Sequence, residues 1–352
     1  MHLRKYLAVG CLALFGLSAQ AETVSGLYQV REPVEGQGAE ARTQATSKAL
    51  DTLVLRLTGD PKAAQSPALA ELRKDPQKII SQFGFEAGPP ETVLVDFDPG
   101  STERTLRKAG LALWGNNRPS ILSWWLNDSV EGSNLVGDGQ SSAEPLRRAA
   151  QHRGLPLRLP LADLSEQLLA TPENLGANDA GELRAASERY AADALLAVQA
   201  REENGQWQAQ WSLWLGEERE QGSVQGADQA ALADAIMLAI SQRLAPRFVV
   251  AAGAASSLTI EVQGVNLARY AELQRILEPF AAQLRKVQGD TLTFQVNASV
   301  EQLRAQLGLA HLQEVTADAP VVDAKQPATA PVTTTEPAPQ AVPSDNLLRF
   351  RW

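Results

Sequence analysis

The sequence predicts an α+β protein built from several small mixed units. Short apolar runs of strand type alternate with helix-type periodicity along most of the chain, and residues 256–316 follow the order β-α-β-β-α-β. That order is typical of a ferredoxin-like unit and implies no particular chemistry. About 330 residues follow an expected leader, which is more than one core usually serves, so we expect several units.

The first residues predict export. Arg4 and Lys5 precede the apolar run 7–17, and Ala19-Gln20-Ala21 has the pattern of a cleavage site. We therefore expect a signal peptide over residues 1–21, cleavage after Ala21 and a periplasmic product. An alternative is a lipoprotein site at Cys11, which would cut the apolar run in half. No later segment is apolar and long enough to cross a membrane.

The amino-acid composition limits the classes of partner and of site chemistry that we expect. The single cysteine, Cys11, lies in the expected leader, so the mature chain is predicted to be cysteine-free. Removal of Arg4 and Lys5 changes the formal net charge from −9 to −11. Because an acidic surface repels phosphate, we expect no nucleic-acid partner. We expect no cofactor and a monomer or weak oligomer.

The N-terminal α/β unit is expected over residues 22–117. A strand is predicted over 24–30, followed by a helix over 39–57 with small and apolar residues at four-residue steps; Gly59 ends it. A second strand covers 92–97, and Ser101 is expected to cap a helix that runs to about Leu113.

The middle α/β unit is expected over residues 118–250. A strand over 120–126, apolar on both faces, belongs to the middle of a covered sheet, and a polar loop over 127–142 follows it. Asn204-Gly205 joins two strands as a hairpin, because this dipeptide favours a tight turn. The other expected elements are helices over 143–152, 180–190 and 229–244 and a strand over 155–159.

The ferredoxin-like unit is the best defined. Its predicted strands begin near Leu258, Leu284, Thr291 and Leu312, and its helices near Leu267 and Val300. Residues 317–352 are then expected to be a disordered tail, because 325–343 consist mainly of Pro, Ala, Thr and Val.

The tail ends in an aromatic segment with two interpretations. Leu348, Phe350 and Trp352 alternate with arginines, which suits a strand that adds to the edge of a partner's sheet. The alternative is a frayed terminus.

Several segments resemble a family of exported proteobacterial proteins, the domain of unknown function 2066 (DUF2066). They are Ala41-Arg42 with Ala45, Ala49-Leu50, Arg56-Leu57-Thr58-Gly59, Val95-Asp96-Phe97-Asp98, Trp114, Arg118-Pro119, Ile121-Leu122-Ser123-Trp124-Trp125-Leu126 and Tyr190-Ala191-Ala192-Asp193-Ala194-Leu195-Leu196. The middle unit is also similar to envelope α/β domains such as the amino-terminal domain of TolB. The resemblance implies binding to other envelope proteins and carries no established activity or site residue.

No familiar catalytic pattern stands out. His152 and His311 are isolated, and the sequence has no phosphate loop, dinucleotide fingerprint or nucleophile elbow. His152 is interpreted as a residue of a helix end, where a cation suits the dipole. Asp96 and Asp98 would suit an acid/base or cation pair on one strand face. We favour the simpler interpretation that Asp98 begins the Asp98-Pro99-Gly100 turn and that Asp96 is solvated.

Tryptophans supply another candidate surface. Trp124 and Trp125 point to opposite faces of their strand and are expected in cores. Trp207 and Trp211 share one face of theirs, which is either core or an exposed stacking platform for a partner.

The sequence therefore favours a non-catalytic binding or adaptor module for another envelope protein or for peptidoglycan. The candidate contact residues are Trp207, Trp211, Leu348, Phe350 and Trp352. The rival hypotheses are a carboxylate-dependent hydrolase acting on an envelope glycan or lipid, and small-ligand binding by the ferredoxin-like unit.

Overall fold

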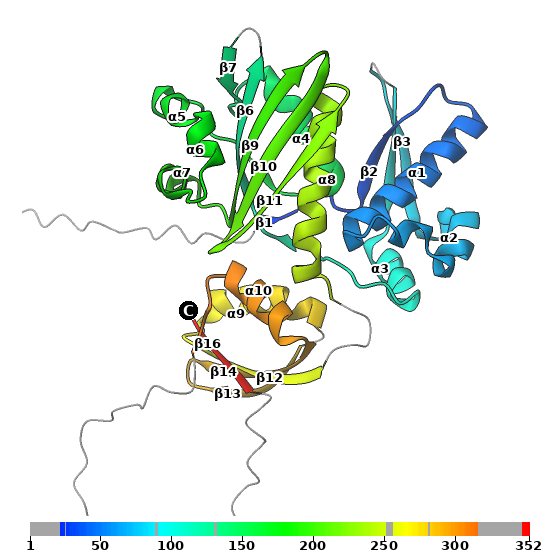
Figure 1. Cartoon of the computed structure of the whole chain (residues 1–352). Coiled ribbons are helices and arrows are strands. Elements are labelled where there is room, and N and C mark those ends of the chain that lie inside the picture. The colour runs from blue at the N-terminus through cyan, green and yellow to red at the C-terminus, as the bar shows by residue number, and fades with distance from the viewer. Residues whose placement is uncertain are drawn as a thin grey trace, which may run out of the picture.

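A computed structural model describes residues 22–24, 26–88, 91–129, 132–250, 256–280, 282–315 and 347–352. The expected signal peptide and most of the expected disordered tail lie outside these ranges. Within them the chain has the predicted α+β architecture, with strands in four sheets (Figure 1). None of the helices in these ranges is long and apolar enough to cross a membrane.

The first unit is a three-stranded antiparallel sheet in the order β2-β4-β3, with α1 packed on it. Its main elements are β2 (Gln29–Pro33), α1 (Ala39–Thr58), α2 (Ala70–Lys74), β3 (Ile80–Glu86), β4 (Thr92–Phe97) and α3 (Pro99–Lys108). The four-residue spacing buries Ala45, Ala49, Leu53 and Leu57 of α1, and Gly59 ends the helix at a φ of 68°.

Several details of this unit differ from the sequence predictions. The helix expected to run to about Leu113 ends at Lys108. Residues 26–28 form a turn, so the strand expected over 24–30 is divided between β1 (Glu22–Thr23) and β2. Strand β3 was missed because only some of its positions are apolar. Asp98, rather than Ser101, caps α3, because its carboxylate accepts from the Ser101 backbone N–H at 2.8 Å.

The second unit is a six-stranded mixed sheet in the order β11-β10-β9-β6-β7, with β8 also paired to β6. Its strands are β6 (Ile121–Ser129), β7 (Gly132–Leu135), β8 (Leu157–Arg158), β9 (Ala194–Glu203), β10 (Gln206–Leu215) and β11 (Glu218–Gly226). As predicted, Asn204-Gly205 turns β9 into β10, and both residues have positive φ. Strands β7 and β11 were missed because their residues are mostly polar.

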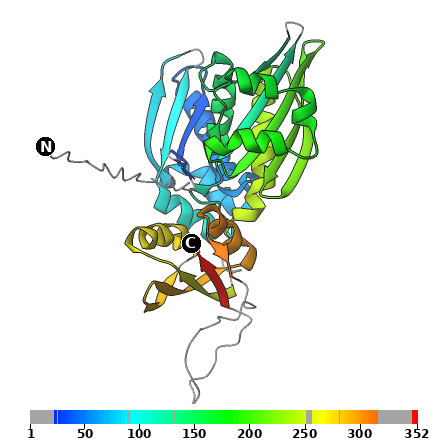
Figure 2. The ribbon, with the colours of Figure 1, turned by 90° about the vertical axis from the view of Figure 1, so that its left-hand side faces the viewer.

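Helices cover both faces of this sheet. On one face lie α4 (Glu144–Arg153) and α8 (Gln229–Phe248), and on the other α5 (Leu164–Leu169), α6 (Pro172–Gly176) and α7 (Gly181–Ser187). Figure 2 shows the same layers after a quarter turn. Trp125 belongs to the first core and Trp124 to the second, as predicted for a strand covered on both faces.

Two buried arginines join the first unit to the second. Arg56 of α1 donates to the backbone oxygens of Leu27, Gln29 and His152. Arg118, which belongs to β5 (Asn117–Arg118), donates to the backbone oxygens of Arg56, Trp114, Gly115, Arg153 and Gly154. Burial lowers the pKa of Arg56 to about 10 and that of Arg118 to about 9.

Gly154 permits this close approach. Its φ is +67°, and an added Cβ would lie 2.7 Å from Arg56 Cγ and 2.9 Å from Leu27 Cδ1. Only glycine suits both the left-handed conformation and the crowded space. The sequence singled out none of these contacts, since the partners are far apart in the chain.

The third unit has the predicted β-α-β-β-α-β order. Its elements are β12 (Ser256–Gln263), α9 (Leu267–Leu277), β13 (Gln283–Gln288), β14 (Thr291–Ala298), α10 (Val300–Leu309) and β15 (Gln313–Glu314). Asn266 and Ser299 cap the two helices. In Figure 1, α9 and α10 lie between this sheet and the rest of the molecule.

The end of the tail is a strand, which differs from the disorder expected over residues 317–352. Residues Leu347–Arg351 form β16, which is inserted into the sheet of the third unit, giving the order β13-β14-β12-β16-β15. Part of the tail expected to be disordered therefore forms a strand, because apolar and basic residues alternate over 347–351, as one of the two interpretations predicted. It pairs within its own chain rather than with a partner's sheet edge.

Candidate binding surface

The open part of the six-stranded sheet carries a row of polar side chains. Helices α5–α7 cover part of this face, where Trp124 of β6 and Trp214 of β10 are buried, and leave much of β9–β11 exposed. Side chains alternate across a strand, and the register places Gln210 of β10 between Gln199 of β9 and Ser223 of β11. Gln208 lies in the same way between Arg201 and Gln225.

Two adjoining cavities follow this row. The larger has a volume of about 680 Å³ and the smaller about 440 Å³, and both are lined by Gln199, Gln210 and Ser223. Helix α6 forms one wall, with Pro172 at the larger cavity and Leu175 and Gly176 at the smaller. We call this combined hollow the amide groove.

The groove presents neutral hydrogen-bonding groups between fixed charges. Gln208, Gln210, Gln221, Ser223 and Gln225 are exposed and make no side-chain hydrogen bond to another described residue. Each amide can donate and accept at once.

Charged side chains lie at the two ends of the groove. Arg201 Nε is 3.1 Å from Asp128 Oδ2 at the larger cavity. At the smaller cavity, Arg219 donates to Ser212 Oγ at 3.0 Å, and its buried Nε has no partner among the described residues. The groove therefore offers spare donors and acceptors to a ligand without concentrating charge of one sign.

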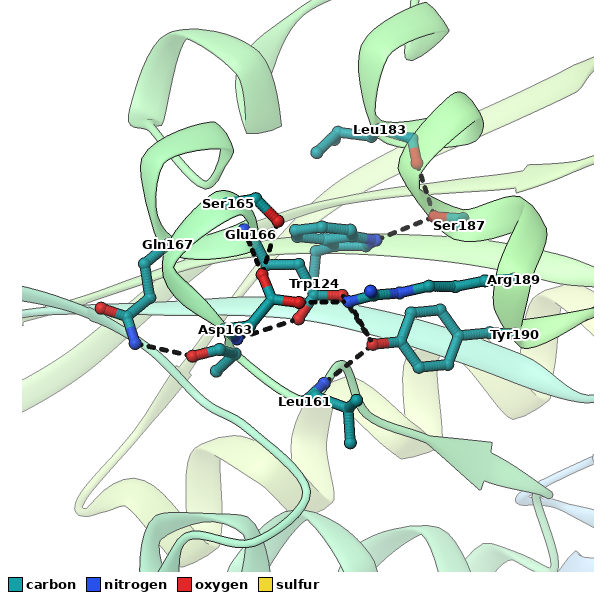
Figure 3. A network of polar contacts seen from close by, with 11 residues as sticks. Trp124, Leu161, Asp163, Ser165, Glu166, Gln167, Leu183, Ser187, Arg189 and Tyr190 are labelled. Carbon is teal, nitrogen blue, oxygen red and sulfur yellow. Dashed lines mark hydrogen bonds and ion pairs between the residues drawn. The ribbon is translucent and has the colours of Figure 1, made fainter.

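A polar network holds α5 and α7, which cover the same face of the sheet as the wall helix α6, in place (Figure 3). Asp163 and Glu166 form a capping box at the start of α5, and the buried Glu166 carboxylate accepts from Tyr190 Oη at 2.6 Å and from Arg189. Trp124 Nε1 donates to Ser187 Oγ of α7 at 3.0 Å. Hydrogen bonds from Ser165, the Glu166 N–H and Arg189 keep the pKa of Asp163 below its usual range. Burial and the bond to Glu166 raise the pKa of Tyr190.

Of the two interpretations of Trp207 and Trp211, the structure has the core and not the exposed platform. Trp207 and Trp211 do share one face of β10, but they belong to the core beneath α8 and are only 7 % and 4 % exposed. Helix α8 covers the face that a hairpin strand would otherwise leave free. The polar side chains on the opposite face, which alternate with these tryptophans in Gln206-Trp207-Gln208-Ala209-Gln210-Trp211, are the exposed ones. The alternation in the sequence could have predicted an exposed polar face on β10. The groove was not predicted from it, because the neighbouring strand β11 was not recognised.

The aromatic tail residues are also packed inward. Phe350 is 2 % exposed in the core of the third unit, and Leu348 and Trp352 are partly buried against the same core. These residues bind a sheet, as the alternation suggested, but the sheet belongs to the same chain.

The acidic pair has local structural partners. Asp96 Oδ1 accepts from Gln29 Nε2 at 2.8 Å, and Asp98 caps α3 through Ser101. Asp98 thus begins the turn as in the simpler interpretation, whereas Asp96, which was expected to be solvated, is half-buried beside Gln29. Among the described residues, no group of three or more His, Cys, Asp or Glu side chains is arranged to hold a metal ion.

Comparison with known families matches residues 21–115 to a domain described as Domain of unknown function (DUF8605). The match covers the first unit and fits an uncharacterised domain. The matched family differs from the DUF2066 family that the sequence segments resembled. No curated protein matches the chain.

Proposed function

We propose that this protein is an exported, non-catalytic binding module of the cell envelope, and that the amide groove holds an extended segment of another envelope protein. The observation that supports the proposal most is the row of unpartnered amide and hydroxyl groups on β10 and β11. The leader pattern of residues 1–21 supports the periplasm as the compartment.

The chemistry of the groove favours a polypeptide over peptidoglycan. A peptide backbone has one donor and one acceptor per residue, which match the paired donor and acceptor of a glutamine amide. Sugar rings favour stacking on exposed aromatic faces. The three tryptophans of β10, Trp207, Trp211 and Trp214, are all buried.

The wall helix α6 supports a defined groove rather than an open sheet face. Gln199 Nε2 donates to the Pro172 backbone oxygen at 2.7 Å, which ties β9 to α6. The network around Glu166 fixes the neighbouring helix α5. Because α6 is held before binding, a ligand would not have to order it, and that lowers the entropic cost of association.

Site-specific photocrosslinking tests the proposal in cells. A photoreactive residue replaces Gln210 in the groove, and the matched control places it at the exposed Gln274 of α9. Both chains keep residues 1–21. Cell fractionation first determines whether each chain is in the periplasm. We expect both chains in the periplasm. The photoreactive residue at position 210, but not the one at position 274, should crosslink to one dominant envelope protein.

A second variant connects any crosslinked protein to the groove chemistry. In Ser223→Arg, a long cation fills the space beside Gln210, and we expect the Gln210 crosslink to fall by about tenfold, which corresponds to 1.4 kcal/mol. Crosslinks to glycan fragments, equal crosslinking at both positions, or no effect of Ser223→Arg would contradict the proposal.

A further inference from the structure

The C-terminal strand occupies an interior position in the sheet of the third unit. It pairs in parallel with β12, from Leu347 opposite Thr259 to Arg351 opposite Gln263. On its other edge it pairs antiparallel with β15, where Gln313 lies opposite Arg351. Residues 316–346 connect β15 to this strand and lie outside the described ranges.

This position departs from the four-stranded order of a split β-α-β unit. In that arrangement the first and last strands of the unit, here β12 and β15, are neighbours. Here β16 separates them, and β16 is the strand with which β15 pairs among the described residues. The third unit is thus an acceptor with two strand edges, and β16 fills the slot between them.

Side chains on both faces fit the slot. On the buried face, Phe350 lies opposite Val262 and Leu348 opposite Ile260, next to the core of the unit. On the other face, Arg349 Nε is 3.8 Å from Glu261 Oε2. Beyond the strand, Arg269 Cζ lies over the Trp352 ring, 5.3 Å from the ring centroid.

The backbone contacts do not depend on which chain supplies the strand. The Val315 N–H donates to the Arg349 oxygen at 2.8 Å, so β16 is bonded along the edge that faces β15 as well as along β12. An identical strand of a second copy can make every one of these contacts. Covalent linkage within one chain adds a local strand concentration of the order of millimolar.

We propose that the slot between β12 and β15 is a strand-receptor site whose ligand in trans is residues 347–352 of a second copy, so that chains associate by exchanging their C-terminal strands. This association surface is separate from the amide groove and does not depend on the proposed function. At low protein concentration the tethered strand of the same chain occupies the slot, and exchange increases with concentration.

Disulfide trapping in the full chain tests the exchange. In a Cys11→Ser background, Glu261→Cys and Arg349→Cys place one thiol on each side of a parallel pair. The double variant should close a disulfide within one chain, which checks that β16 occupies the slot. The two single variants are then mixed under a glutathione redox buffer, and we expect a mixed disulfide dimer whose yield rises with protein concentration.

Matched controls separate strand exchange from random collision. Adding Phe350→Asp to the Arg349→Cys chain should lower the mixed dimer by about tenfold or more, because a charged side chain cannot enter the apolar core. A free peptide of residues 344–352 should compete with the exchanged strand. If the double variant closes but the mixed dimer never exceeds the Phe350→Asp control, or the peptide has no effect, exchange between copies is ruled out.

Discussion

The Nδ1 atom of His152, in the last turn of α4, lies 3.3 Å from Oδ1 of Asp234 on α8. Its Nε2 atom lies 3.4 Å from Glu32 Oε1 of β2, a carboxylate that also accepts from Thr52 at 2.6 Å. One imidazole therefore connects the first unit to two helices of the second. Hydrogen bonds to Asp234 and Glu32 raise the pKa of His152, while burial opposes them.

This raised pKa predicts a pH-dependent stability. The stabilising contribution of protonated His152 is fully present below the ordinary histidine pKa of about 6.5 and is lost as the pH rises through the higher folded-state pKa. We expect His152→Gln to lower the free energy of unfolding by up to about 1 kcal/mol at pH 6, and by less at pH 8, because the side chain is partly exposed. Urea unfolding at both values measures the difference.

His311→Asn is the control for this pH series, because Asn tolerates the positive φ of 58° at that position and His311 lies away from the contact between the units. An equal loss at pH 6 and pH 8 for His152→Gln would mean that the imidazole acts by packing alone.

At acidic pH, two carboxylates change the stability in the opposite direction. The pKa values of Glu32 and Asp234 are lowered despite their desolvation, so the stability that these carboxylates contribute is lost as the pH falls through their folded-state pKa values.

Removing the buried Arg118 should destabilise the junction of the units strongly. Arg118→Leu leaves buried carbonyl oxygens without their donor and removes the guanidinium that lies 4.1 Å from the Trp114 ring centroid. We expect a loss of about 3–5 kcal/mol in the free energy of unfolding, measured by chemical denaturation. Arg148→Leu, on the exposed side of α4, should change stability by no more than about 0.5 kcal/mol.

Phe350 should stabilise the third unit in spite of its place near the end of the chain. Its side chain is buried against the core formed with Ile260 and Val262. We expect Phe350→Ala to lower the free energy of unfolding by about 3–5 kcal/mol if the cavity does not collapse. Arg351→Ala, at the exposed neighbouring position, is the control. Similar stabilities for both variants would show that β16 adds little to the unit.

Glu166 should keep α5–α7 against the sheet. Glu166→Gln removes the charge that accepts from Tyr190 and Arg189, and we expect a loss of about 1–3 kcal/mol, concentrated in this segment. Limited proteolysis should then cleave residues 160–180 faster than in the parent chain. Glu173→Gln, an exposed change in α6, should leave the cleavage rate unchanged; accelerated cleavage there too would point to general fraying of the helices.

Local patterns predicted most elements because their causes are local. The four-residue spacing of α1, the Asn204-Gly205 turn and the apolar run of β6 each act through neighbouring residues. The missed strands β3, β7 and β11 have weak or polar patterns, and sheet neighbours stabilise them. The short helices α5 and α6 were missed although local start signals precede them, the Asp163–Glu166 capping box and the Thr171-Pro172 cap. Helices of six and five residues are too short to show helical periodicity.

By itself, the sequence determined the α+β class, the β-α-β-β-α-β order of the third unit and the alternation that makes residues 347–351 a strand. Only the tertiary structure decided that this strand enters its own sheet, that Arg118 joins the first two units and that Gln199, Gln210 and Ser223 line one groove. The physical reason is that backbone preference and side-chain periodicity act over a few residues. Strand pairing and burial depend instead on which distant segments meet.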